Sequence, residues 1–273
     1  MASSRFSSSP SWRSWCSSRA LALAAGLALG VAALPAAAAD PCAGAYSGRA
    51  TVDLAAVANG AGGVSRLWGS ERMHAAGGVV TVDFPKGSIN PGNKAAPEGG
   101  AGFLAALPGG AEAACLGYDV RLPAGFAFAK GGKLPGLYGG EGPTGCAKGK
   151  GMDGFSARLM WRAKGAGEVY LYAPEKEAKC GVSIGRGKFR FATDRWVRVT
   201  EEIVLGRPGV ADGRLRLWID GTLVVARDDL LLREQPDVAV GGAMFSTFFG
   251  GDDPAWASPA DQSIAFRDMV IYH

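Results

Sequence analysis

The segment Phe155-Ser-Ala-Arg-Leu-Met-Trp-Arg162, followed after a short turn by Glu168-Val-Tyr-Leu-Tyr172, decides the fold. Apolar side chains occupy alternate positions in both runs, a pattern typical of antiparallel strands with one buried face. Pairing Arg162 with Glu168 across the turn 163–167 places Met160 opposite Tyr170 and Arg158 opposite Tyr172. Because opposed and diagonal side chains lie within reach of each other, we expect one solvated sheet face to carry a cluster made of Ser156, Arg158, Tyr170 and Tyr172.

Short alternating runs recur along the rest of the chain, separated by Gly, Pro, Asp and Asn. Asp220-Gly221 supplies the positive φ angles of a tight hairpin turn. Residues 85–111, rich in Gly, Pro, Ala and Asn, predict a long surface excursion. The sequence therefore predicts an all-β, single-domain antiparallel β-sandwich, with strands at 79–84, 115–122, 155–162, 169–172, 196–204, 215–219, 222–226, 238–245 and 264–271.

The first 39 residues have the order of a signal peptide. Three arginines precede an apolar stretch at 21–34, then come Pro35 and a run of alanines. A membrane anchor is the alternative, because 21–39 is nearly long enough to span a bilayer. The early proline and the small residues favour cleavage after Ala39. We therefore expect a secreted protein that is soluble, with no membrane association once the signal is removed, in which residues 40–114 and 115–273 belong to one domain.

Charge and cysteine content exclude several classes of protein. The net charge of +4 falls to +1 once the three arginines of residues 1–39 are removed, which argues against a nucleic-acid-binding protein. Four cysteines remain, a number that suits two disulfides, whereas a metal site is poorly supplied with ligands. The register proposed above brings position 146 near 184. It thus favours the pair Cys146–Cys180 and leaves Cys42–Cys115.

Two further segments are candidates for a site. In Lys130-Gly-Gly-Lys133-Leu-Pro-Gly-Leu-Tyr-Gly-Gly140, flanking glycines let the backbone turn tightly and approach a ligand. In Phe245-Ser-Thr-Phe-Phe-Gly-Gly-Asp-Asp253, a strand runs into glycines and two carboxylates, which leaves open whether calcium binds there. Each segment has a plainer interpretation: Lys133 as a solvated lysine, and the last segment as core phenylalanines followed by a solvated turn.

Together these segments resemble polysaccharide lyase family 14, the alginate and glucuronan lyases. The matching pieces are Gly-Gly-Lys133-Leu-Pro-Gly-Leu, Ser156-Ala-Arg158-Leu-Met-Trp-Arg162 with Tyr170-Leu-Tyr172, Trp218-Ile-Asp-Gly221 and Phe245-Ser-Thr-Phe-Phe-Gly-Gly251, over about residues 115–273. The resemblance implies a β-jelly roll with an open cleft. It also implies a catalytic cluster at the matching positions Lys133, Ser156, Arg158, Tyr170 and Tyr172. We assign Lys133, Arg158, Tyr170 and Tyr172 as catalytic residues and Ser156 and Arg162 as substrate-binding residues. We expect a monomer that acts on an anionic polysaccharide without a cofactor, and we assign no metal ligand.

Those residue types suit elimination across C4–C5 of a uronate. The C5 proton is poorly acidic while the neighbouring carboxylate is ionised, and Arg158 would offset that charge. Lys133 would neutralise developing charge, or act as base if its pKa is lowered. Tyr172 would give or take the proton, because nearby cations favour its phenolate form. Tyr170 would orient the sugar or assist proton transfer. Which residue is base and which is acid stays open.

Other enzyme classes lack their residues here. No strand carries the paired carboxylates of a retaining glycosidase, and Ser156 has no credible histidine base. The remaining alternative is a non-catalytic, lectin-like carbohydrate-binding sandwich.

Overall fold

The computed structural model describes residues 40–146, 153–174 and 180–273, and these residues form one compact unit. The predicted signal peptide, residues 1–39, lies outside the described residues. In the described part of the chain, no helix is long and apolar enough to cross a membrane.

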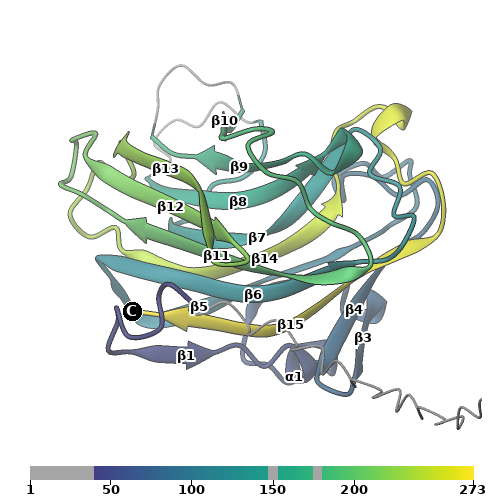
Figure 1. Cartoon of the computed structure of the whole chain (residues 1–273), viewed down its shortest axis with the longest axis horizontal. Coiled ribbons are helices and arrows are strands. Elements are labelled where there is room, and N and C mark those ends of the chain that lie inside the picture. The colour runs from purple at the N-terminus through teal and green to yellow at the C-terminus, as the bar shows by residue number, and fades with distance from the viewer. Residues whose placement is uncertain (1–39, 147–152, 175–179) are drawn as a thin grey trace, which may run out of the picture. The chain divides into compact units, whose positions relative to one another are not determined.

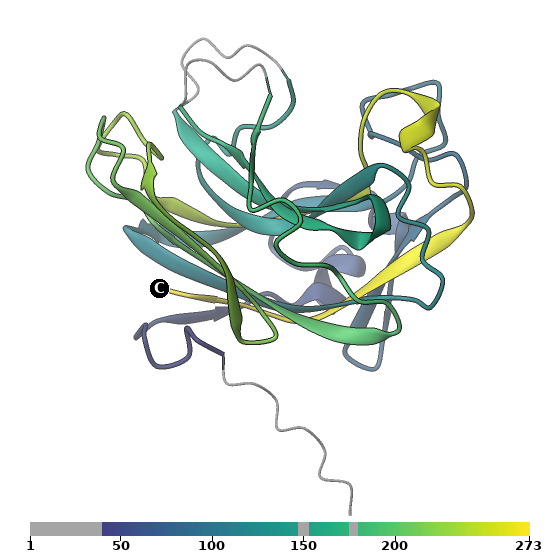
Figure 2. The ribbon, with the colours of Figure 1, turned by 45° about the horizontal axis from the view of Figure 1, so that its top comes forward.

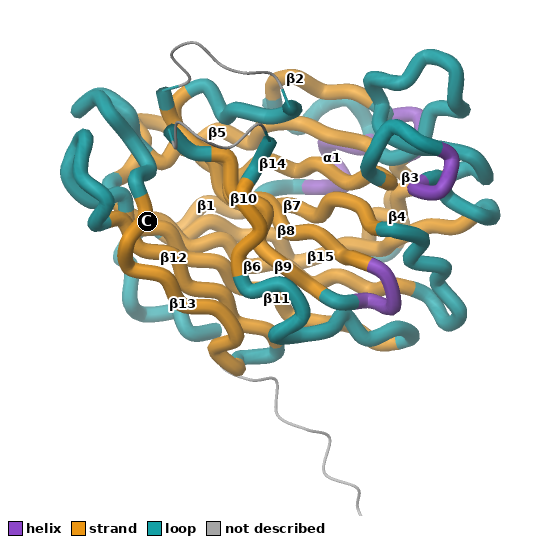
Figure 3. The backbone as a smooth tube through the Cα atoms, turned by 90° about the horizontal axis from the view of Figure 1, so that it is seen from above, coloured by secondary structure: helices purple, strands orange, loops and turns teal. Residues whose placement is uncertain are grey.

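Two antiparallel β-sheets lie one over the other and form a sandwich (Figure 1). We call them the front sheet and the back sheet, names that do not refer to the direction of view in the figures. The front sheet, which Figure 3 shows from above, runs β10 (Val182–Ile184), β9 (Gly167–Tyr172), β8 (Gly154–Arg162), β7 (Gly131–Gly140), β14 (Val240–Phe249), β5 (Ala101–Ala111) and β2 (Ser65–Trp68). The back sheet runs β13 (Thr222–Leu230), β12 (Gly213–Ile219), β11 (Arg195–Val204), β6 (Ala113–Leu122), β15 (Gln262–Tyr272), β4 (Val79–Phe84) and β3 (Met73–Ala76), with β1 (Arg49–Thr51) paired to one end of β15. The predicted all-β sandwich is confirmed.

Helices are few and short in the described residues (Figure 2). The single α-helix is α1 (Leu54–Ala58), which Asp53 caps and which buries Leu54 and Val57 in the core. Three 3-10 helices complete the described elements: η1 (Ser70–Arg72), η2 (Ala163–Gly165) and η3 (Pro254–Trp256).

The core lies between the sheets and is built by the predicted alternation. On β8, Phe155, Ala157, Leu159 and Trp161 are all fully buried. The Trp161 ring packs edge-on against Phe84 of the back sheet and Phe249 of the front sheet, with ring centroids 6.3 and 5.3 Å away. This apolar packing fixes the face of β8 that points away from the core.

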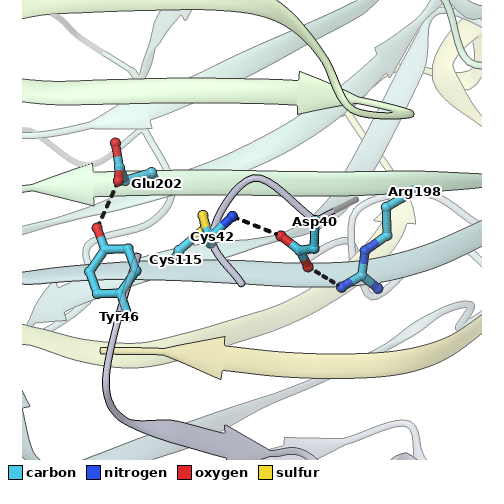
Figure 4. Close-up of a disulfide and its surroundings, with 6 residues drawn as sticks. All are labelled: Asp40, Cys42, Tyr46, Cys115, Arg198 and Glu202. Atoms are coloured by element: carbon cyan, nitrogen blue, oxygen red, sulfur yellow. Dashed lines mark hydrogen bonds and ion pairs between the residues drawn. A yellow bond between two sulfur atoms is a disulfide. The ribbon is translucent and has the colours of Figure 1, made fainter. Parts of the chain in front are cut away.

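Both favoured disulfides, Cys42–Cys115 and Cys146–Cys180, are present. The first ties the start of the described chain to β6, and neighbouring side chains strengthen the attachment (Figure 4). Asp40 accepts a hydrogen bond from the Cys42 amide and forms an ion pair with Arg198 at 2.7 Å, while the Tyr46 hydroxyl donates to Glu202 at 2.8 Å. This segment is therefore held against the back sheet.

Two expectations from the sequence are wrong. Residues 101–111 of the predicted surface excursion form β5, which lies between β14 and β2 and buries Phe103. The glycine-rich segment around Lys133 is the inner strand β7 and does not form a tight turn. The plainer interpretation of Lys133 as a solvated lysine is wrong as well, because Lys133 is buried. Glycine is needed there because a Cβ at Gly132 would lie 2.1 Å from the Trp161 ring. Glycines in both strands reflect close packing between neighbours.

The register between β8 and β9 differs from the predicted one by two residues. Met160 lies opposite Glu168, Arg158 opposite Tyr170 and Ser156 opposite Tyr172. The turn is centred one residue earlier than expected, because η2 occupies 163–165 and β9 begins at Gly167. Side chains alternate with a period of two, so a shift of two residues leaves every side chain on its predicted face.

Candidate active site

The outer face of the front sheet forms the floor of a cleft of about 590 Å³. Strands β7, β8, β9 and β14 supply the floor, and loop residues form the rim, including Asn90, Thr144 and Trp256. Three of the four members of the predicted cluster, Arg158, Tyr170 and Tyr172, therefore line a cleft. The cluster is more deeply buried than the solvated face that the sequence indicated, since Arg158 is only 3% exposed.

Lys133 enters the cleft from β7, opposite Met160 of β8. Its Nζ lies 2.8 Å from the Met160 sulfur and 3.6 Å from the centroid of the Tyr170 ring. Burial lowers the pKa of Lys133 well below its usual range, and the positive charges of Arg158 and Arg162 lower it further. A lysine in this setting readily takes the neutral amine form that a general base requires.

Arg158 lies on the floor of the cleft. Its Nη1 donates to the Ser246 hydroxyl at 3.2 Å, its guanidinium carbon lies 5.5 Å from the Tyr172 ring centroid, and its buried Nε has no hydrogen-bond partner. Burial lowers its pKa to about 10, so it stays cationic at neutral pH. Among the described residues no carboxylate lies within 4.0 Å of Arg158 or Lys133.

Arg162 has a different environment from Arg158, although both project from the same face of β8. Its Nε donates to Glu168 Oε1 at 2.8 Å, and Glu168 is fully buried and also accepts from the Ser183 hydroxyl at 2.6 Å. The guanidinium carbon lies 5.6 Å from the ring centroids of both Tyr170 and Trp256. Arg162 lines the cleft as predicted, but its charge is already paired.

The two tyrosines of β9 pack edge to face, with ring centroids 5.4 Å apart. The cation of Arg158 favours the phenolate of Tyr172, as expected, and so do hydrogen bonds from the Gly145 and Gly181 amides. Burial outweighs these effects and raises the pKa of Tyr172. The expected effect of the nearby cation is therefore present but outweighed. Of the two roles left open, giving or taking the proton, the raised pKa favours Tyr172 as a phenol that can give one.

Ser156 does not line the cleft. Its side chain is fully buried, and its hydroxyl donates to the Pro143 carbonyl at 2.6 Å. The serine thereby fastens the loop that follows β7, whose residues Thr144 and Gly145 form part of the rim.

Several cleft residues were not assigned a role from the sequence, although Ser246 and Phe248 belong to the candidate segment 245–253. Met160 contacts Lys133, Ser246 contacts Arg158, and Trp68 and Phe248 pack edge-on at 6.2 Å beside them. The residue types alone give no signal for these contacts, except that Met160 alternates with the apolar face of β8. Their partners come from distant strands.

The carboxylates after β14 lie in an exposed turn. Asp252 accepts from Asn90 at 2.8 Å, and Asp253 caps η3 through the Ala255 amide. Over the part of the chain that the structure describes, no group of three or more His, Cys, Asp or Glu side chains could hold a metal ion.

Comparison with known proteins relates this arrangement to one family. The family model for polysaccharide lyase 14 matches residues 72–269. A PL-14 alginate lyase from Aplysia kurodai is 29% identical, with 77% of this chain and 90% of that chain covered and a TM-score of 0.67.

Two further solved structures extend the comparison. An alginate lyase from Chlorella virus is 26% identical over 82% of this chain and 98% of that one, with a TM-score of 0.70. An endo-β-1,4-glucuronan lyase from Trichoderma reesei shares the fold at 10% identity, with 83% and 95% covered and a TM-score of 0.55. A comparison with curated protein sequences finds no match.

Proposed function

Because the chain belongs to polysaccharide lyase family 14, we propose that it cleaves a polyuronate, alginate or glucuronan, by β-elimination in the cleft of the front sheet. The alginate lyases of Aplysia kurodai and Chlorella virus and the fungal glucuronan lyase support this class of substrate. The products would carry an unsaturated uronate at the new chain end.

One observation carries the proposal: two buried basic side chains lie on the cleft floor, and among the described residues neither has a carboxylate partner. Lys133 is 6% exposed and Arg158 3% exposed. Buried charges are costly unless they are paired. In the described residues Arg162, on the same strand, does have its carboxylate. A uronate carboxylate would supply the missing partner of Arg158 and receive bidentate hydrogen bonds from it.

The pKa directions suggest how the groups divide the chemistry. The substrate carboxylate binds Arg158, which offsets its charge and makes the C5 proton more acidic. The neutral amine of Lys133 takes that proton, and the C5–H electron pair forms the C4–C5 double bond as the bond from C4 to the glycosidic oxygen breaks. Tyr172, a phenol because burial raises its pKa, gives its proton to the departing oxygen. The face of the Tyr170 ring packs against the Lys133 amine and helps to hold it in place.

The test is to incubate the purified protein with alginate and with glucuronan and to follow unsaturated uronate by ultraviolet absorbance. We expect Lys133→Ala and Tyr172→Phe each to lose most of the activity while keeping the fold. Lys130→Ala is the matched control, because Lys130 lies in the same segment but is exposed and paired with Asp253. Equal activity of Lys133→Ala and Lys130→Ala would remove Lys133 from the mechanism.

The assay also separates an enzyme from a lectin-like protein. Binding of polyuronate without any rise in absorbance over a panel of polyuronates would overturn the proposed activity. We further propose that the protein is secreted after removal of residues 1–39 and acts as a monomer. Two intramolecular disulfides support export to an oxidising compartment, and size-exclusion chromatography with light scattering tests the monomer.

A further inference from the structure

Two polar side chains of the back sheet cross the core and bind the backbone of β7. The Tyr118 hydroxyl of β6 donates to the Pro135 carbonyl at 3.0 Å, and Glu201 Oε2 of β11 accepts from the Leu137 amide at 2.8 Å. Both side chains are fully buried. They are diagonal neighbours on the inner face of the back sheet, since Tyr118 pairs with Val199 and Glu201 with Leu116.

The two hydrogen bonds meet β7 at an irregularity of the strand. Leu134 lies opposite Leu159, but the next pair is Gly136 with Arg158, so Pro135 is an extra residue. Leu134 and Leu137 are both fully buried core residues although they are three positions apart. Regular alternation would send one of them to the cleft. The bulge at Pro135 therefore allows Lys133 to face the cleft while both leucines stay in the core.

Backbone groups at a bulge lose regular ladder partners and need others when they are buried. Tyr118 and Glu201 supply those partners directly behind the active strand. The bulge also brings Gly136 against Arg158: a Cβ at Gly136 would lie 2.0 Å from the Ala157 carbonyl oxygen. Residues 134–136, which include the bulge, thus lead along β7 from Lys133 to Gly136, the residue that lies against the backbone next to Arg158.

A glutamate at this buried position is energetically unfavourable. Its second oxygen, Oε1, has no hydrogen-bond partner, and burial raises its pKa well above the usual range, so it is an uncharged acid in the core. An apolar residue of similar size commonly serves a buried position equally well or better. The acid therefore calls for an explanation beyond packing.

We propose that Glu201, assisted by Tyr118, is a positioning residue that holds the Pro135 bulge and thereby sets Lys133 against Arg158 in the cleft. The inference rests on the proposed lyase function for its kinetic readout. It concerns residues of the back sheet that do not line the cleft.

Three variants test it. Glu201→Leu removes the acceptor, Glu201→Gln keeps one for the Leu137 amide, and Thr200→Val is the matched control. Thr200 is the neighbouring buried residue on β11, its hydroxyl also lacks a partner, and the alternation of the strand turns it to the other face of the back sheet. All three are assayed for thermal stability, kcat, KM and the pH dependence of kcat.

We expect Glu201→Leu to lower kcat about tenfold or more, because small misplacements of catalytic groups are expensive, with KM within about twofold. Its melting temperature should stay close to that of the wild type, because the loss of the acceptor for the Leu137 amide is offset by the loss of the unpaired Oε1. Its pH profile should shift with the environment of Lys133. Glu201→Gln should recover most of kcat, and Thr200→Val should match the wild type.

Two results would overturn the proposal: a Glu201→Leu enzyme with wild-type kcat and pH profile, or a Glu201→Gln enzyme as impaired as Glu201→Leu with an equal loss of stability. If Glu201→Leu fails to fold, the positioning role is tested with Tyr118→Phe, which deletes a single hydroxyl. An unchanged kcat and pH profile of Tyr118→Phe would overturn that role. If the wild type cleaves no polyuronate, the proposed function fails by itself. The titration of Lys133, followed by NMR in the wild type and the variants, then decides the positioning role, and an identical titration refutes it.

Discussion

Replacing Arg158 with methionine should stabilise the protein and abolish its activity. Burial lowers the pKa of this guanidinium to about 10, and each pKa unit of difference between the folded and unfolded states is worth about 1.4 kcal/mol. From an ordinary pKa above about 12, the fold bears a cost of about 3 kcal/mol for holding the cation. The folded-state pKa is the lower one, so this cost is present in full at neutral pH and fades only as pH rises through about 10.

Methionine removes the charge and keeps most of the unbranched side chain. It forfeits the hydrogen bond to Ser246, worth about 1 kcal/mol, which leaves a net gain of about 2 kcal/mol. For a protein of this size the melting temperature should rise by roughly 4–8 °C. Polyuronate should raise the melting temperature of the wild type but not that of the variant, because the carboxylate has lost its partner.

Arg162→Met is the matched control on the same face of β8. It removes the nearer of the two cations paired with the buried carboxylate of Glu168, the other being Arg186 at 3.6 Å. Breaking such a pair costs about 3 kcal/mol, so the melting temperature of this variant should fall. Differential scanning calorimetry without substrate measures both variants. The reasoning is refuted if Arg158→Met melts below the wild type, or if the two variants shift in the same direction.

Three further outcomes are expected. The pH–rate profile should rise through the lowered pKa of Lys133, whose neutral amine is the proposed base, and fall only in alkaline solution where Tyr172 ionises. Residual activity of Tyr172→Phe that keeps the alkaline fall would contradict the proposed acid role. Replacing Cys42 and Cys115 by alanine removes a disulfide that joins residues 73 positions apart. The free energy of unfolding, measured in urea, should fall by about 4 kcal/mol while kcat stays unchanged; a variant that loses kcat at full stability would contradict this. Mass spectrometry of the exported protein should show Asp40 at its amino terminus, and a different first residue would move the cleavage site.

The sequence was most informative where one strand carries its own signal. The alternation in β8 identifies both the core face and the cleft face, and it survives the two-residue error in register because the error is even. The side chains of Arg158, Tyr170 and Tyr172 consequently meet as predicted. Lys133 joins them, which the resemblance implied but no local pattern predicted.

The predictions from the sequence fail where the surroundings of a residue in the fold decide its conformation or its protonation. β5 and β7 look like loops because glycine is rich in both, yet each is flanked by strands that leave no room for larger side chains. The net pKa shift of Tyr172 could not be predicted because its charged neighbour was visible in the sequence whereas its burial was not. The contact between Glu201 and Leu137 joins residues 64 positions apart, and it depends on how the two sheets stack.

The last strand gives the molecule a convenient point of attachment. β15 ends beside β1, where Gly48 and His273 exchange backbone hydrogen bonds of 2.8 and 3.1 Å. Strands β1 and β15 belong to the back sheet, the layer opposite the cleft. The chain that precedes Gly48 is already fastened to β6 by a disulfide. A catalyst coupled to a bead or fibre through a linker after His273 would therefore turn its open cleft toward the surrounding liquid, where long, viscous polymer chains can reach it.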